Sequence, residues 1–301
     1  LAPLAARPQR HRPTAAMVQP HHGLGAFGHG SVDGALGATG ALIIRAPEKL
    51  QQRRLAVSAA TINLAIRPQN EAQTTRITNM GHLYLVRHGQ ASLGAADYDQ
   101  LSPLGQQQSQ RLGEHWRTLG IQFDAVITGS MKRHAQTLAS IQAGMGTAHE
   151  AIVLPALNEY DAEAVIRTIQ PGELVKPTTP EGYKQYFRLL RDGLTQWMAG
   201  VVSPQGMPSY AEFAHGVTSA LDQIRQQHEG HVLLVSSGGP IATAVAHVLR
   251  TSPETSIELN MRLRNTAVTE FSFNPKRHSL QSFNCLPHLE TPNHKDWVTF
   301  A

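Results

Sequence analysis

The sequence predicts an α/β fold: a three-layer α/β/α sandwich around a mainly parallel sheet with an antiparallel edge. Two observations carry this prediction. Short apolar runs alternate with amphipathic helical stretches between residues 82 and 250, which is typical of strand–helix–strand units. Two more strand-like runs then follow each other without a helix between them, at 266–273 and 279–284, and favour an antiparallel pair that closes the sheet.

Four strands are expected in the parallel part of the sheet, at residues 82–86, 123–128, 151–154 and 231–235. One helix is expected to begin at Ser102-Pro103, because serine caps a helix and proline suits its first turn. Other helices are expected at 131–143, 210–227 and from Pro240 to Leu249. Residues 156–209 break the alternation with several prolines and one amphipathic helix. We expect this insertion to form a helical cover that sets selectivity.

The first 79 residues differ in composition from the rest of the chain. They hold nine Lys and Arg against three acidic residues, a net charge of +6, so the chain total of +4 leaves −2 for residues 80–301. Many Ala, Gly, Pro, Gln and Arg without periodicity predict a disordered basic leader, and an organelle transit peptide is the alternative. Met80 directly precedes the first strand. We expect it to be the native start, with residues 80–301 forming one domain.

Several classes of protein are disfavoured by the composition. The basic sequence pI of 9.4 belongs to the leader, so we predict no nucleic-acid binding. Aliphatic patches such as 41–44 are too short to span a membrane. Cys285 is the only cysteine, which excludes a disulfide within the chain and a cysteine-based metal site. We expect a cytoplasmic protein that needs no metal or cofactor, and we predict no particular homo-oligomer.

Polar motifs follow the predicted strands at the points where those strands end. Arg87-His88-Gly89 follows the first strand, a loop leading to Arg133 follows the second, and Ser236-Ser237-Gly238-Gly239 follows the fourth. Glu159 lies in the irregular stretch after the third strand. Because the carboxyl ends of parallel strands meet at one edge of a sheet, we expect these residues to lie together.

These residue types suit the transfer of a phosphoryl group. Arg87 and Arg133 can bind phosphate oxygens through two parallel hydrogen bonds each. The neutral imidazole of His88 can attack phosphorus, and the carboxyl group of Glu159 can protonate the leaving group. Backbone N–H groups after Ser237, beginning with that of Gly238, would face an anion at a helix N-terminus. The pattern therefore predicts a phosphate site with a histidine nucleophile and no metal.

Three segments resemble the histidine phosphatase (phosphoglycerate mutase-like) superfamily: Leu83–Ser92, Leu101–Gly105 and Arg133–Thr137. The resemblance covers about residues 80–284. It implies that His88 is the phosphorylated nucleophile and Glu159 the proton donor. It also implies that Arg87 and Arg133 bind the phosphate.

The chain departs from the family pattern at Ser237, where the family has a second histidine. A serine hydroxyl donates one hydrogen bond and carries no charge, so turnover is expected to be slower. Ser237 also has a second interpretation, as the cap of the following helix. Five other histidines are loose candidates for supplying the absent imidazole, although the pattern favours an ordinary surface or packed residue for each: His134, His215, His228, His231 and His247.

Three functions follow as hypotheses. The first is a metal-independent phosphomonoester hydrolase that acts on a small phosphorylated substrate through phospho-His88. The second is a phosphoglycerate mutase-type phosphotransferase, which the segment Gln90–Gly94 disfavours because such mutases have Glu-Ser and a Trp-Asn pair there. The third is a weakly active or inactive pseudophosphatase that binds a phosphate ligand, motivated by Ser237.

Overall fold

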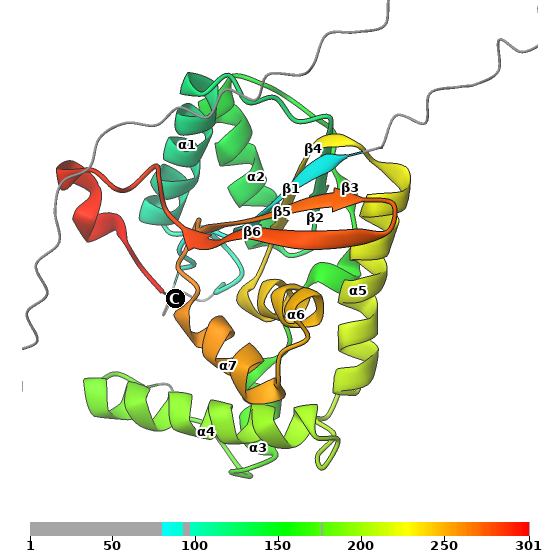
Figure 1. Cartoon of the computed structure of the whole chain (residues 1–301). Coiled ribbons are helices and arrows are strands. Elements are labelled where there is room, and N and C mark those ends of the chain that lie inside the picture. The colour runs from blue at the N-terminus through cyan, green and yellow to red at the C-terminus, as the bar shows by residue number, and fades with distance from the viewer. Residues whose placement is uncertain (1–79, 93–96, 176, 301) are drawn as a thin grey trace, which may run out of the picture. The chain divides into compact units, whose positions relative to one another are not determined.

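The computed structural model describes residues 80–92, 97–175 and 177–300. In this part of the chain, six strands form one sheet in the order β3-β2-β4-β1-β5-β6 (Figure 1). The strands are β1 (Gly81–Arg87), β2 (Ala125–Thr128), β3 (Ile152–Val153), β4 (Gly230–Ser236), β5 (Val268–Asn274) and β6 (Arg277–Cys285). The four strands β1 to β4 are parallel to one another. Strand β5 runs antiparallel to both of its neighbours, β1 and β6. The predicted fold class is confirmed.

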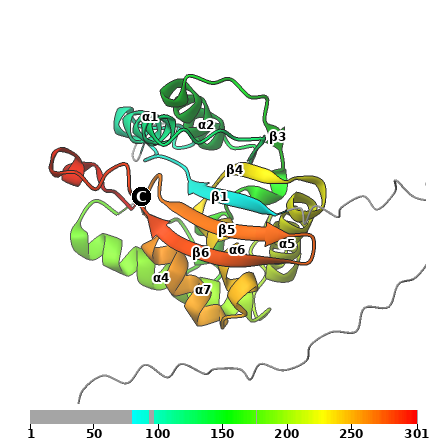
Figure 2. The ribbon, with the colours of Figure 1, turned by 45° about the horizontal axis from the view of Figure 1, so that its top comes forward.

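Helices lie on both faces of the sheet, which gives the three predicted layers (Figure 2). The α-helices are α1 (Pro103–Thr118), α2 (Lys132–Met145), α3 (Ala162–Arg167), α4 (Pro180–Met198), α5 (Tyr210–Gln227), α6 (Gly238–Leu249) and α7 (Pro253–Arg262). Two 3-10 helices, η1 (Pro155–Leu157) and η2 (Pro292–Trp297), complete the described elements. No described helix is long and apolar enough to cross a membrane.

The alternation of side chains along β1 divides the core between the two faces. Tyr84 and Val86 pack with Leu112 and Trp116 of α1 and with Ile141 of α2. Leu83 and Leu85, which alternate with these residues along β1, point to the opposite face of the sheet. There they pack in a core that includes residues of α5 and α6. Strand β1 therefore packs against both helical layers, and its C-terminal end lies between them.

A third apolar cluster joins α3, α4 and α7 beside the main core. Its buried members include Val165, Leu194, Trp197 and Ile257. Thr179 caps α4 with its side chain, and Pro180 takes the first helical position, so the proline-rich stretch ends where the helix begins. The insertion after residue 156 is thus helical, as predicted. Helix α7, which packs against it, is an element that the sequence analysis did not identify.

Two predicted boundaries were wrong in detail. Helix α6 begins at Gly238, two residues before Pro240, because the helix accommodates Pro240 within its first turn. Strand β3 has only two residues, both exposed, so the expected strand at 151–154 is a short edge. The predicted leader, residues 1–79, lies outside the described residues. That Met80 is the native start stays a prediction.

Candidate active site

The loops that follow β1, β2 and β4 meet at one edge of the sheet, as predicted. Arg87 pairs with Ser236 in the register of β1 and β4, and Thr128 pairs with Val235 in that of β2 and β4. The backbone N–H of His88 then donates to the carbonyl of Ser236 at 2.9 Å. The ends of the three strands are therefore level, and the residues that follow them share a site.

His88 is almost fully buried, with 3% of its surface exposed. Its Nδ1 lies 2.7 Å from the carbonyl oxygen of Gly89. Because a carbonyl oxygen only accepts, Nδ1 must carry the ring hydrogen, and Nε2 keeps a lone pair. Burial holds the pKa of His88 well below its ordinary value, and the charges of Arg87 and Arg133 lower it further. The imidazole is therefore neutral, and its Nε2 has no hydrogen-bond partner in the part of the chain that the structure describes.

Arg87 lies at the end of β1 and extends towards the C-terminal segment. One guanidinium nitrogen, Nη1, donates to the carbonyl of Leu263 at 2.5 Å and also to that of Phe300. Its Nε is buried without a hydrogen-bond partner among the described residues. Backbone carbonyls therefore hold the arginine in place. Its Nε–H group can still donate a hydrogen bond to an oxyanion.

Arg133, in the first turn of α2, is 5% exposed. Its Nη1 forms an ion pair with Asp99 at 2.9 Å, and Asp99 also accepts from the backbone N–H of Lys132. The ring of Tyr98 lies 5.7 Å from the guanidinium carbon. Like Arg87, Arg133 has a buried Nε without a partner in the described part of the chain. Asp99 thus fixes the position of this cation and leaves part of it for a ligand.

Glu159 lies at the N-terminus of α6. Both carboxylate oxygens accept from the backbone N–H of Gly239, at 3.1 and 3.2 Å. Burial raises the pKa of Glu159, against the opposing effects of this N–H group and the charges of Arg133 and Arg87. A carboxyl group with a raised pKa keeps its proton to higher pH, which suits a proton donor. The N–H of Gly239, expected to be open to an anion, already has Glu159 as its acceptor.

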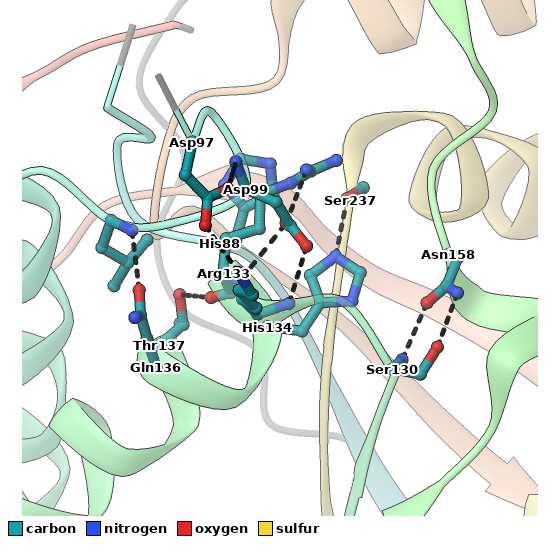
Figure 3. A network of polar contacts seen from close by, with 12 residues as sticks. His88, Asp97, Asp99, Ser130, Arg133, His134, Gln136, Thr137, Asn158 and Ser237 are labelled. Carbon is teal, nitrogen blue, oxygen red and sulfur yellow. Dashed lines mark hydrogen bonds and ion pairs between the residues drawn. The ribbon is translucent and has the colours of Figure 1, made fainter. Parts of the chain in front are cut away.

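Ser237 occupies the N-cap position of α6, but its side chain makes no capping hydrogen bond. Its hydroxyl instead lies 2.7 Å from Nε2 of His134 (Figure 3). Of the five histidines considered as a source of the absent imidazole, His134 is the one that the structure joins to Ser237. The interpretation of Ser237 as a side-chain cap is therefore wrong.

Three residues that support the site, the buried Thr137 and Asn265 and the half-buried Asp99, were not identified from the sequence. Thr137 accepts from the N–H of Gly89 at 3.0 Å and donates to the carbonyl of Arg133 at 2.7 Å. Asn265 donates to the carbonyl of His88 at 3.1 Å. Asp99 holds Arg133, as described above. Thr137 belongs to the segment Arg133–Thr137, which resembles the superfamily, so the sequence could have indicated it. Asn265 lies in a loop, where no sequence pattern indicates its role.

The rim of the site is aromatic. Tyr160, next to Glu159, accepts a hydrogen bond from the amide of Asn260 at 2.8 Å. On α4, burial together with the charges of Glu163 and Tyr98 raises the pKa of Tyr186 to about 12. The ring of Tyr98 also lies near the guanidinium of Arg133. Among the described residues, no group of three or more His, Cys, Asp or Glu could hold a metal ion.

The family model of the histidine phosphatase superfamily (branch 1) matches residues 83–286. The chain belongs to the histidine phosphatase superfamily. The match includes β1 with the Arg-His-Gly motif, the two helical layers and the insertion. Membership supports phosphatase or mutase activity and agrees with a site built from two arginines, a free imidazole and a buried carboxyl group.

Individual relatives are distant. The mitochondrial serine/threonine-protein phosphatase PGAM5 of Xenopus laevis is 22% identical over 197 residues, which cover 64% of this chain but only 61% of that protein. The putative phosphoserine phosphatase 2 of Hydrogenobacter thermophilus is 26% identical over 222 residues, 69% of this chain and 98% of that protein. A crystal structure of phosphoglycerate mutase from Bacillus anthracis is 17% identical, covers 70% of this chain and 96% of that one, and superposes with a TM-score of 0.51. This last likeness shows the fold.

Proposed function

We propose that this histidine phosphatase superfamily member hydrolyses phosphomonoesters through a phosphohistidine on His88. The observation that carries the proposal is the hydrogen bond from Nδ1 of His88 to the carbonyl of Gly89. This bond leaves Nε2 as an unprotonated nucleophile in a buried site, and the low pKa keeps it unprotonated near neutral pH. In the proposed reaction the chain supplies all reacting groups except water, and we expect it to act in the cytoplasm.

The phosphoryl oxygens are bound by the two arginines in this proposal. The Nε groups of Arg87 and Arg133, which have no hydrogen-bond partner among the described residues, are donors that a phosphate oxygen would satisfy. Ser237 and the N–H of Gly238 complete the set at the start of α6, where the helix dipole favours negative charge. Two guanidinium groups held in place by Leu263, Phe300 and Asp99 neutralise the charge that develops during transfer.

Hydrolysis then takes two displacements. Nε2 of His88 attacks phosphorus, the N–P bond forms and the P–O bond to the alcohol breaks. Glu159 gives its proton to the departing oxygen. In the second displacement, the Glu159 carboxylate takes a proton from a water molecule, whose oxygen attacks phosphorus. The N–P bond breaks, inorganic phosphate leaves, and both His88 and Glu159 return to their starting states.

Two alternatives remain distinct from this proposal. A mutase would retain the phosphoryl group and return it to another oxygen of the same molecule. The segment Gln90–Gly94 argues against that, since it lacks the Glu-Ser and Trp-Asn residues of such mutases. A pseudophosphatase would bind phosphate without turnover. The raised pKa of Glu159 and the free Nε2 of His88 favour turnover over mere binding.

We propose a small phosphorylated molecule as the substrate. The matched relatives differ in their substrates by name, one being a protein phosphatase and another a putative phosphoserine phosphatase. The solved structure of a phosphoserine phosphatase from Entamoeba histolytica, which is 22% identical to this chain with a TM-score of 0.50, holds 3-phosphoglyceric acid, and this supports a compact substrate.

The test compares the full chain with the variant His88→Asn on phenyl phosphate, phosphoserine and 3-phosphoglycerate. Release of inorganic phosphate by the wild type and its loss in the variant support the hydrolase. Conversion of 3-phosphoglycerate to its isomer without phosphate release would favour the mutase. Binding of inorganic phosphate without turnover on any substrate would favour the pseudophosphatase. Equal hydrolysis by both proteins would overturn the role of His88.

A further inference from the structure

His134 and Ser237 form a buried polar pair in the wall of the site. Both side chains have no exposed surface, and Nε2 of His134 lies 2.7 Å from Oγ of Ser237. The ring of His134 lies 5.9 Å from that of His88, measured between centroids. Figure 3 shows the imidazole reaching from α2 to the start of α6. The pair thus adjoins the nucleophile that the proposed function uses.

The hydrogen bond must be assigned a direction, since either partner can donate. Burial, with the charge of Arg133, lowers the pKa of His134 to about 3, so the ring is neutral and carries one hydrogen. Its Nδ1 is buried, has no partner among the described residues and faces Gly129, where a Cβ would lie only 2.4 Å away. A buried N–H without an acceptor is rarer and less favourable than a bare acceptor. The hydrogen therefore resides on Nε2, which donates to Ser237.

This direction decides what the serine hydroxyl can do. Its oxygen accepts from His134, and its side chain makes no capping bond to α6, so its own hydrogen remains available. Ser237 follows Ser236, whose carbonyl accepts from the N–H of His88, and it precedes the glycine pair that holds Glu159. Ser237 therefore stands in the chain between a residue that contacts the nucleophile and one that contacts the proton donor.

We propose that His134 is a positioning residue that orients the Ser237 hydroxyl as a hydrogen-bond donor to the transferring phosphoryl group. An imidazole on α2 and a serine at the start of α6 together take the place of the single histidine that the family resemblance puts before the glycine pair. Gly129 leaves the room that the ring needs. The proposal rests on the hydrolase function proposed above.

Its first test is spectroscopic and needs no turnover. Long-range ¹H–¹⁵N correlation spectra of the full chain, labelled on histidine, report which nitrogen of His134 carries the hydrogen. Assignment comes from the loss of one set of signals in His134→Ala. The proposal predicts a neutral Nε2–H ring whose signals shift when inorganic phosphate binds, and in Ser237→Ala that shift should disappear. An Nδ1–H ring, or a ring that phosphate does not affect, would overturn it.

The second test is kinetic and uses phenyl phosphate. His134→Ala should lower kcat by about tenfold to a hundredfold with little change in KM, because an oriented donor acts mainly in the transition state. Ser237→Ala should lower kcat further, and adding His134→Ala to it should cause no additional loss. Independent, multiplying losses would overturn the proposal. His247→Ala, at an exposed position on α6, is the control and should match the wild type.

An exchange of the two residues gives the sharpest result. Ser237→His alone should reduce activity, because His134 occupies the space that a second ring needs. The double variant His134→Ala with Ser237→His should recover activity above either single variant, since one imidazole again faces the phosphoryl group. Failure of a folded double variant to recover would overturn the proposal. If the wild type shows no turnover on any substrate, the hydrolase proposal fails, while the spectra still decide the role of His134.

Discussion

The carboxylate of Glu159 accepts from the backbone N–H of Gly239, the second residue of α6, through both of its oxygens. A helix N-terminus normally stabilises the ionised form of a carboxyl group. Burial outweighs this effect, so that the pKa of Glu159 is raised. The same N-terminus therefore orients the group without forcing it to lose its proton.

The first prediction concerns this proton and the leaving group. Glu159→Gln cannot donate, so kcat on an alkyl phosphate should fall by about a hundredfold to ten-thousandfold. On p-nitrophenyl phosphate, whose leaving group needs no proton, the loss in the first displacement should be much smaller. Steady-state and burst kinetics on both substrates measure the difference. Equal losses would contradict the role of Glu159. The matched control is Glu163→Gln on α3, whose side chain is 45% exposed.

The pH dependence of the wild type follows from the same pKa shifts. Glu159 must be protonated for the first displacement, so kcat/KM should fall as the pH rises through its raised pKa. His88 must be unprotonated, and its pKa lies well below its ordinary value, so activity should persist far into the acidic range. A rate profile on an alkyl phosphate should show an acidic optimum. An optimum on the alkaline side would contradict these assignments.

A second prediction tests the geometry of Arg133. Lysine keeps the charge but loses the planar fork that binds two oxygens and pairs with Asp99. Arg133→Lys should lower kcat/KM on phenyl phosphate by about a hundredfold to a thousandfold. It should also weaken competitive inhibition by inorganic phosphate. Arg117→Lys, exposed near the end of α1, should leave both quantities unchanged. A wild-type value in Arg133→Lys would remove Arg133 from the phosphate site.

The third prediction concerns the buried hydroxyl of Thr137, which joins the nucleophile loop to α2. Thr137→Val leaves the N–H of Gly89 without its acceptor. The free energy of unfolding should therefore fall by about 1–3 kcal/mol. Urea unfolding measures this change. Thr118→Val removes an exposed hydroxyl with a similar bond within α1 and should cost at most about 0.5 kcal/mol. Similar losses in the two variants would mean that the link to Gly89 contributes nothing.

The fourth prediction concerns stability in acid. Burial lowers the pKa of His288 to about 3, far below its ordinary value of 6.5. The unfolded chain binds a proton there between these values and the native protein does not, so the free energy of unfolding falls as the pH drops below about 6.5. His134 has a similar shift. His288→Gln should reduce the slope of stability against pH by about 1.4 kcal/mol per pH unit. The exposed His247 provides the control, and an unchanged slope in His288→Gln would contradict the shift.

Much of the fold follows from local patterns in the sequence. The Ser102-Pro103 signal predicts the start of α1, and the hydroxyl of Ser102 does accept from Gly105. The apolar run ending at Arg87 predicts β1, because a central strand is buried on both faces. Helix α7 was missed because it is short and only two of its residues are buried, which leaves a weak apolar period.

The site is predictable only in part, for a physical reason. Motifs at strand ends bring His88, Arg133 and Ser237 to one edge by topology alone. The pairing of His134 with Ser237 joins residues 103 positions apart, and it depends on how the first turn of α2 faces α6. No sequence period encodes that orientation.

The central claim is the phosphohistidine, and trapping it is the most direct test. Glu159→Gln, mixed with p-nitrophenyl phosphate, should form the phosphoenzyme quickly and hydrolyse it slowly, because no carboxylate is present to activate water. After an alkaline quench, ³¹P NMR and peptide mass spectrometry should find one phosphoryl group on Nε2 of His88, and none in His88→Asn. A phosphoryl group on Nδ1 or on another residue, or turnover by His88→Asn, would contradict the account.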